Sequence, residues 1–303
     1  MPRQGPAAFL AGLILPHREV TGVAMSEICP VSSPFATGSQ RVHVSAHDYH
    51  RRVPASTTPR TWAGLRRRIA LYPPEPAGRP GICAVCRGPA RPGYARCYQC
   101  AQHDLLGRGR ADAVVPVSYA VKGTAFAASL WRYKSWRAPE PAARASLLAL
   151  LLVFLHDHGR CVWRHAGMPP PGRLAVVPTG CGRPGPHPLL ELCAPYLRLP
   201  VAGLVIRPGE QGRDPNVDRF SAERTGPGAS VLLLDDSWVS GASAQSAAAA
   251  LKRAGARHVA VVVLGRHVDP ADPLGGPLAA RLAPHPYDPG ECAVHALPSR
   301  PAA

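Results

Sequence analysis

Two adjacent carboxylates, followed by a loop of small residues, form the most chemically informative stretch of this chain. Asp235 and Asp236 come directly after four apolar residues, 231–234, and the loop beyond them contains Gly241. A glycine lets the backbone approach a ligand closely, and open N–H groups at the start of a helix attract a phosphate. Two carboxylates would repel a phosphate, but they can accept hydrogen bonds from sugar hydroxyls or hold Mg²⁺ nearby. Phosphate on one side and a diol on the other describe a ribose 5-phosphate.

The segments around these carboxylates predict a strand, a loop, a helix and a second strand. Residues 231–234 have the length and composition of a strand buried on both faces, and the alanine-rich run after Gly241 is typical of a helix that ends at Gly255. The next apolar run, 258–264, predicts another strand. This order forms a βαβ unit, whose crossover is almost always right-handed. The alternative is a buried strand that ends in an acidic turn.

This stretch resembles the motif with which type I phosphoribosyltransferases bind phosphoribosyl pyrophosphate (PRPP). That motif is an apolar strand, two acidic residues, two variable residues and a short loop of Thr or Ser with Gly or Ala. The chain departs from it at Val239, where a small polar residue is common, and has serine instead of threonine at 240 and 243. The resemblance implies that Asp235 and Asp236 position the ribose. The implied phosphate-binding residues are Ser237, Trp238, Val239, Ser240, Gly241, Ala242 and Ser243.

Four of the nine cysteines form two close pairs with ten residues between them. They are Cys83, Cys86, Cys97 and Cys100. Two Cys-x-x-Cys pairs offer four thiolates at a spacing typical of a tetrahedral, structural zinc site. The alternative is two disulfides, which need an oxidising compartment, whereas no targeting segment is evident and we expect a cytoplasmic protein. His103 is a weaker candidate ligand that is expected at the surface, and most of the remaining cysteines are expected to be buried or incidental.

A zinc ribbon ahead of a PRPP motif resembles the ComF-like branch of the phosphoribosyltransferases. The resemblance covers residues 83–264 and implies a pyrophosphate-binding loop after the strand at 174–177. There, backbone N–H groups and an arginine would bind the pyrophosphate, while an ordinary Gly/Pro turn is the alternative. The Arg-Gly-Phe-Asn-Gln run usual in the family is replaced here by 184–188. The implied loop residues are Thr179, Gly180, Gly182 and Arg183.

The segment 207–228 carries alternating basic and acidic residues and lies where type I enzymes have a mobile catalytic loop. Arginines on such a lid can close over a polyphosphate and exclude water. Mixed charge on a surface loop also serves solubility alone, so this alternative stays open. The candidate lid residues are Arg207, Arg213 and Arg219.

A helix predicted at 123–134 ends in Tyr133 and Lys134. This end resembles the family's segment ending in Lys-Tyr, which forms the hood over the nucleobase side. The alternative is an amphipathic helix whose basic end extends to solvent.

The remaining apolar runs complete an α/β pattern. Strands are predicted at 115–119, 174–177 and 201–206, and helices at 142–156 and 189–197. Strands that alternate with helices favour a doubly wound parallel sheet, with ligand loops at the carboxyl ends of its strands. We expect four regions: a disordered basic arm (1–75), a zinc ribbon (76–110), a phosphoribosyltransferase-like α/β domain (111–268) and a proline-rich tail (269–303).

The formal charge of +16 is concentrated in the N-terminal part, where residues 1–110 hold 15 Arg or Lys against 5 Asp or Glu. A basic arm can bind nucleic acid, and it can equally be a solvated extension. No Gly-x-x-x-x-Gly-Lys-Ser/Thr loop is present, which excludes a P-loop nucleotide kinase. We expect no membrane partner, because the apolar run near the N-terminus is too short to span a bilayer.

The leading hypothesis is therefore a phosphoribosyltransferase-like protein that binds PRPP with Mg²⁺. By resemblance it would transfer the phosphoribosyl group to an amine or a nucleobase and release pyrophosphate. The alternative is a non-catalytic protein that uses the same fold to bind PRPP or a nucleotide, or that handles DNA through its ribbon and basic arm.

Overall fold

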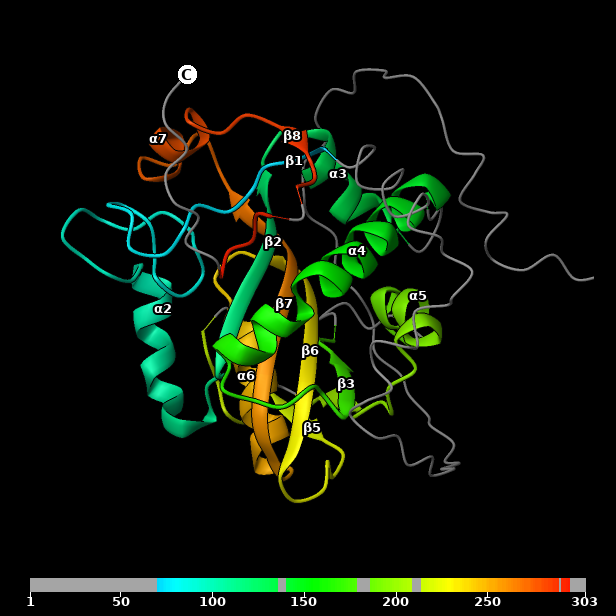
Figure 1. Ribbon diagram of the computed structural model, residues 1–303. Helices are drawn as coiled ribbons and strands as arrows, with labels where there is room; N and C mark the ends of the chain where they lie inside the picture. The colour runs from blue at the N-terminus through cyan, green and yellow to red at the C-terminus, as the bar shows by residue number, and fades with distance from the viewer. Residues whose placement is uncertain (1–69, 136–139, 179–185, 209–213, 289, 295–303) are drawn as a thin grey trace, which may run out of the picture.

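The computed structural model describes residues 70–135, 140–178, 186–208, 214–288 and 290–294. Its centre is a parallel sheet of four strands in the order β2-β7-β6-β3 (Figure 1). The strands are β2 (Ala113–Val121), β3 (Arg173–Val176), β6 (Ala229–Trp238) and β7 (Ala256–Val268). The predicted parallel α/β sheet is confirmed, and the acid pair lies on β6, a central strand of it.

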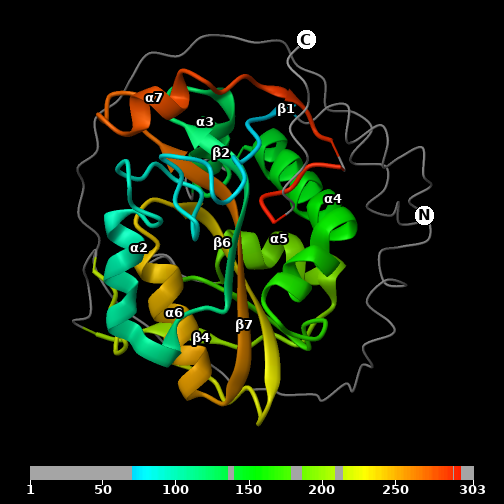
Figure 2. The same cartoon turned by 60° about the vertical axis from the view of Figure 1, so that its left-hand side comes forward.

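Helices cover both faces of this sheet. Figure 2 shows the sheet between α2 and α6 on one side and α4 and α5 on the other. The first face is covered by α2 (Tyr98–Gln102), the 3-10 helix η3 (His103–Gly109) and α6 (Ala242–Arg253). The second is covered by α3 (Ala125–Arg132), α4 (Pro141–His165) and α5 (Pro188–Leu197).

The side chains of β6 show why the strand is apolar at every position between these layers. Val231 and Leu233 belong to the apolar cluster on the α6 side, whereas Leu232 and Leu234 belong to the cluster on the α4 side. Successive side chains of a strand point to opposite faces, so a strand covered on both sides needs a continuous apolar run. The sequence-based interpretation of residues 231–234 is confirmed.

The strand predicted at 201–206 is wrong as a strand of the parallel sheet. Only Val201 reaches that sheet, through a single parallel bridge to Leu174. Residues Leu204–Ile206 form β4, which pairs antiparallel with β5 (Phe220–Ala222) in a separate two-stranded sheet. The side chain of Val205 is 49% exposed, as expected for a strand outside the core. The apolar run alone did not distinguish a half-exposed hairpin from a buried strand.

Helix α4 is longer than the predicted 142–156 and is apolar enough to cross a membrane by length and composition. Its mean hydropathy is 1.4 in the most apolar window, but 61% of that window is buried inside the molecule. Leu147, Leu151 and Phe154 pack against the sheet within the main apolar cluster. This burial is typical of the core helix of a soluble protein.

Residues 1–69 of the expected basic arm lie outside the described residues. Its last six residues, 70–75, were expected to be disordered but are part of the folded structure. Strand β1 (Ala70–Leu71) pairs antiparallel with β8 (His285–Pro286). Leu71 is 4% exposed, and the N–H of Tyr72 donates to Ser118 Oγ at 3.1 Å. Residues 70–75 therefore join the core, although prolines conceal this in the sequence.

The expected proline-rich tail also begins inside the folded part. It contains α7 (Gly275–Ala279) and β8, and then Tyr287, Cys292 and Ala293 enter the same apolar cluster as α4. The guanidinium of Arg87 donates to the carbonyl of Ala293 at 3.1 and 2.9 Å. The described residues up to Val294 thus pack on the domain. Single buried residues without periodicity gave no signal in the sequence.

Candidate functional site

Strand β6 extends further than its apolar run. It continues to Trp238, which pairs with Arg266 of β7, so both carboxylates and the first two residues of the expected loop lie in the strand. The reason is that β7 also continues, to Val268, and offers backbone partners along this length. The loop between β6 and α6 is consequently shorter than predicted. It consists of Val239, Ser240 and Gly241.

Asp236 has two fixed partners from the end of α3. The Tyr133 hydroxyl donates to Asp236 Oδ2 at 2.5 Å, and Lys134 Nζ lies 3.0 Å from the same oxygen. Asp236 is 4% exposed and Tyr133 is fully buried. The N–H of Asp236 donates to Asp235 Oδ1 at 2.9 Å, which fixes the two carboxylates relative to each other. The sequence did not predict that Asp236 contacts Tyr133 and Lys134. It predicted only that both residues belong to the hood over the nucleobase side.

The two carboxylates differ in their protonation. Burial tends to raise the pKa of Asp236, but the Lys134 ammonium and the Tyr133 hydroxyl lower it below the ordinary value. Burial and the neighbouring charge of Asp236 raise the pKa of Asp235 to about 8. At neutral pH the pair therefore holds one proton and one negative charge, which Lys134 balances.

Helix α3 reaches the acid pair because the residue of β7 that faces it is a glycine, Gly265. A Cβ on Gly265 would lie 2.3 Å from Leu130 Cδ1 and 2.9 Å from the Ala120 methyl. Without that Cβ, the helix can pack closely over the sheet and end at the carboxyl edge of β6. Thr124 caps the helix, since its Oγ1 accepts a hydrogen bond from the N–H of Ala127 at 3.4 Å.

The loop after the acid pair is built over a buried tryptophan. Gly241 has φ +81°, and a Cβ there would lie 2.0 Å from the indole of Trp238. Trp238 is 1% exposed and contacts the ring of His103 edge-on, with centroids 5.8 Å apart. The Trp238 side chain thus points into the core, and its predicted place in the phosphate loop stays a prediction. His103 is buried rather than exposed as expected. The loop's own outward side chain is Val239, which is 62% exposed.

One of the expected lid arginines contacts the first turn of α6. Arg219 is 6% exposed, and its guanidinium donates to Ser243 Oγ at 3.2 Å. Arg207 instead lies 3.8 Å from Asp218, with half of its side chain exposed. Arg213 lies outside the described residues. The structure therefore brings Arg219, but not Arg207, to the predicted phosphate loop.

The pyrophosphate-loop residues Thr179, Gly180, Gly182 and Arg183 lie outside the described residues, so their role stays a prediction. The chain leaves β3 beside the acid pair, where the N–H of Val177 donates to the Leu234 carbonyl at 2.9 Å. On the far side of the gap, His187 caps α5 by accepting from the N–H of Leu189 at 3.1 Å. His187 also lowers the pKa of Asp236 by its charge, which the sequence did not indicate.

The four predicted zinc ligands come together. Their Sγ atoms lie within 4.8 Å of one another, and all four side chains are buried. The donor set fits zinc, because the sulfurs also accept hydrogen bonds: the N–H of Gly88 and the Nε of Arg266 each lie 3.4 Å from Cys86 Sγ. The four-cysteine group could therefore hold a zinc ion.

Arg266 connects this four-cysteine group to the candidate site. It is 7% exposed, and its guanidinium donates both to Cys86 Sγ and, at 3.1 Å, to the carbonyl of Trp238. Gly88 leaves room for it, since a Cβ there would lie 2.0 Å from the guanidinium. The cysteine segment shares its apolar cluster with α6 and β7. It is thus packed onto the α/β core and supports the end of β6.

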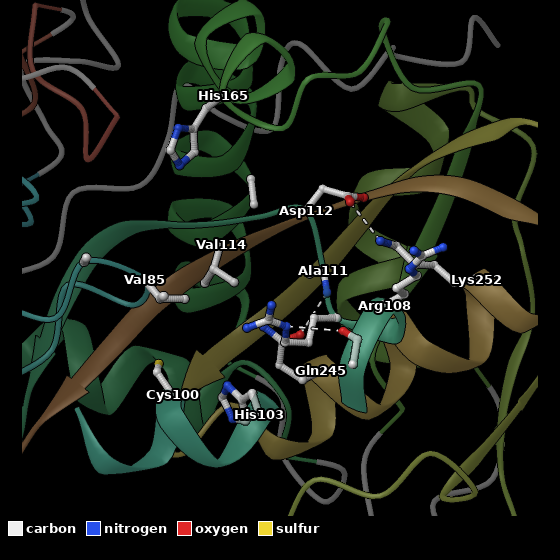
Figure 3. A pocket seen from close by; sticks show the side chains of 14 residues that line it. Val85, Cys100, His103, Arg108, Ala111, Asp112, Val114, His165, Gln245 and Lys252 are labelled. Atoms are coloured by element: carbon white, nitrogen blue, oxygen red, sulfur yellow. Dashed lines mark hydrogen bonds and ion pairs between the residues drawn. The ribbon is translucent and has the colours of Figure 1, made fainter. Parts of the chain in front are cut away.

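A cavity of about 400 Å³ lies elsewhere, between the cysteine segment, η3, β2 and α6 (Figure 3). Arg108, Arg110 and Lys252 line it, but Lys252 is paired with Asp112 at 2.8 Å and Arg110 with Asp104. Gln245 accepts the N–H of Ala111 at 2.9 Å, which joins α6 to the start of β2. Because most of its polar side chains are paired within the protein, this cavity is a weaker candidate for a ligand site than the acid pair.

The candidate site is therefore the carboxyl end of β6, where the acid pair, the Tyr133–Lys134 corner, the loop to α6 and Arg219 meet. Comparisons with protein-family models, curated proteins and solved structures found no match to this chain.

Proposed function

We propose that the protein binds PRPP with Mg²⁺ at the carboxyl end of β6 and transfers its phosphoribosyl group to an amine or nucleobase. The observation that carries the proposal is the sequence of groups along one strand–loop–helix unit. Asp235 and Asp236 lie near the carboxyl end of β6, a central parallel strand that ends at Trp238, and Gly241 at φ +81° is the N-cap of α6 three residues later. A type I phosphoribosyltransferase-like fold, of the ComF-like kind, is part of the same proposal.

The first turn of α6 is the proposed site for the 5-phosphate. A helix of this length carries a partial positive charge at its N-terminus, where the first N–H groups have no partner within the helix. Arg219 adds a full positive charge beside Ser243, at 3.2 Å from its Oγ. Backbone donors with a nearby guanidinium are a combination that favours a phosphate dianion.

The acid pair is the proposed site for the ribose hydroxyls. Asp236 is held as a carboxylate by Lys134 and Tyr133, so it is an acceptor of fixed position. Asp235, whose pKa is raised to about 8, can donate or accept a hydrogen bond near neutral pH. One oxygen from each carboxyl group would form a hydrogen bond with one of two neighbouring ribose hydroxyls. These two bonds would fix the sugar ring, and with it the anomeric carbon, relative to the phosphate.

In the proposed reaction, the nitrogen of the acceptor forms a bond to the anomeric carbon as the bond to the pyrophosphate oxygen breaks. The nitrogen then loses its proton to solvent or to the leaving group. Positive charge develops on the ribose ring, and the carboxylate of Asp236 would stabilise it. Mg²⁺, when bound with PRPP, neutralises the leaving pyrophosphate.

A non-catalytic binding protein is the second candidate, and one contact favours it. Lys134 already occupies the carboxylate of Asp236 at 3.0 Å, so a Mg²⁺ ion would compete with an ammonium for that oxygen. A protein that only binds PRPP or a nucleotide needs no cation to enter there. Release of pyrophosphate in the presence of amines and nucleobases separates the two candidates.

The binding proposal is tested by Ser243→Asp. The new carboxylate would pair with Arg219 and repel a phosphate, while an acidic residue in the first turn of a helix suits the helix dipole and preserves the fold. Calorimetric titration with PRPP·Mg²⁺ and with ribose 5-phosphate should show affinity for both reduced about tenfold or more.

The matched control is Ser146→Asp, which adds the same charge at an exposed position of α4. This control should bind both ligands like the wild type. If the wild-type protein binds neither ligand, or if Ser243→Asp binds as tightly as the control, the proposed function is wrong.

A further inference from the structure

His158, Cys161 and Cys292 place a second group of metal-binding side chains together, independent of the four-cysteine group. One ligand atom from each lies within 4.8 Å of the others. His158 and Cys161 are three residues apart on α4, and side chains at this spacing lie on the same face of a helix. Cys292 comes from the C-terminal segment, 131 positions beyond Cys161 in the chain. The sequence gave no indication of this meeting.

The donor set selects a narrow class of ion. Two thiols and one imidazole suit Zn²⁺, whereas Mg²⁺ and Ca²⁺ need oxygen ligands that the three residues lack. Zinc lies about 2.3 Å from sulfur and about 2.0 Å from nitrogen, so ligands of one tetrahedral ion are on the order of 3.5 to 4 Å apart. Small side-chain rotations bring donors separated by up to 4.8 Å to these positions.

The surroundings hold these side chains in place. The ring of His158 lies between Phe154, at 5.3 Å between centroids, and Tyr287, at 6.2 Å. His158 is 1% exposed and Cys292 is 9% exposed. Next to Cys292, the carbonyl of Ala293 accepts two hydrogen bonds from Arg87. The three donors thus sit on a helix and on an anchored segment, not on loose surface loops.

Cys161 is the half-buried member of the group and leaves one side of the cluster accessible. Three protein donors leave the fourth position of a tetrahedral zinc ion to water or to another small donor. We propose that His158, Cys161 and Cys292 form a second zinc site of this kind, which fastens the C-terminal segment to α4. This site is separate from both the four-cysteine group and the acid pair, so the proposal stands independently of PRPP binding.

Metal content of the full-length protein, purified under reducing conditions with zinc present, tests the proposal. Wild type should carry about two zinc ions per chain, and Cys292→Ser and Cys161→Ser about one each. The matched control is Cys193→Ser, because Cys193 is a buried cysteine of α5 outside both groups, and it should keep both ions.

Cobalt substitution provides a second readout that does not depend on total metal. Wild type loaded with Co²⁺ should show sulfur-to-cobalt charge-transfer absorption from both sites, and Cys161→Ser should lose only the part due to the two-thiolate site. Wild type with one bound metal ion and a cobalt spectrum unchanged by Cys161→Ser would overturn the proposal. A disulfide between Cys161 and Cys292 in the reduced preparation would overturn it as well.

Discussion

At the scale of single residues, the candidate site contains two aspartates, Asp235 and Asp236, that have the same side chain but different interaction partners. Asp236 pairs directly with Lys134 and Tyr133. Asp235 accepts hydrogen bonds from backbone N–H groups, and burial and the charge of Asp236 raise its pKa more than the charge of Lys134 lowers it. The difference explains why one carboxyl loses its proton readily and the other keeps it up to a pKa of about 8. The sequence predicted the acid pair itself, since two acidic residues follow a buried strand. Its partners could not be predicted, because Lys134 lies 102 residues away from Asp236 and meets it only through the packing of α3.

Asp235→Asn should change the pH dependence of stability in a defined direction. A pKa raised in the folded state means that the stabilising contribution is complete below the unfolded pKa near 3.8 and is lost as pH rises toward about 8. The asparagine cannot ionise, so the variant should gain on wild type as pH rises from 5 to 9, by on the order of 1 kcal/mol or more at the alkaline end. Thermal unfolding of both proteins across this range measures the difference.

Asp104→Asn is the contrasting control for this experiment. Arg96 lowers the pKa of the exposed Asp104, so replacing Asp104 should bring no gain with rising pH. A constant difference between Asp235→Asn and wild type from pH 5 to 9 would show that Asp235 titrates normally.

At the scale of elements, the four-cysteine group and the loop before α6 are parts of one structure. Arg266 on β7 donates to a cysteine sulfur on one side and to the last carbonyl of β6 on the other. His103, from the 3-10 helix that follows the second cysteine pair, packs on the indole beneath Gly241. A sequence motif locates each group separately, but only the register of β6 against β7 places Trp238 next to Arg266. The expected separate ribbon is therefore a support for the loop.

Arg266→Lys should loosen this loop while the sheet remains folded. Lysine keeps the charge but cannot donate to both the sulfur and the carbonyl in the same way, and a hydrogen bond from a charged group to a buried acceptor contributes about 1.5 to 3 kcal/mol. Hydrogen exchange followed by mass spectrometry should show peptides covering 238–243 exchanging about tenfold faster or more. For protein loaded with zinc at the four-cysteine group, removal of the ion with a chelator should have the same local effect.

Arg281→Lys is the control, because Arg281 donates to the carbonyl of Pro277 in α7 through an exposed hydrogen bond. Peptides of α4 serve as the internal reference for global stability. Equal acceleration in α4 and in the loop would mean that the variant acts by global destabilisation, and an unchanged loop would mean that Arg266 does not support it.

At the scale of the whole molecule, the sequence predicted the central sheet and its covering helices better than the two ends of the folded domain. The four parallel strands and their covering helices follow from apolar runs, because residues such as Val231 and Leu232 must be buried on both faces of the sheet. The ends of the domain depend on single buried side chains between prolines, such as Leu71 and Tyr287, which have no period to detect. Likewise, no pattern in the sequence indicates that Cys292 lies beside α4. Non-local packing determines these features.

Two truncated chains test whether residues 70–75 belong to the domain. A chain that begins at Ala70 keeps the pairing of β1 with β8, the burial of Leu71, and the hydrogen bonds of Tyr72 with Ser118 and Tyr119. A chain that begins at Pro76 loses all of them. Burial of one leucine side chain contributes about 1.5 to 3 kcal/mol, and each hydrogen bond about 1 kcal/mol. For a domain of this size the shorter chain should therefore melt roughly 10 °C lower.

Leu71→Ala in the longer chain isolates the part of this difference that comes from side-chain burial. Leucine-to-alanine changes in a core cost about 2 to 5 kcal/mol, so this variant should melt between the two truncated chains. Circular dichroism under reducing conditions measures all three transitions. If the chains that begin at Ala70 and Pro76 melt together, the pairing of β1 with β8 contributes nothing to stability, and residues 70–75 belong to the arm that the sequence predicts at 1–75.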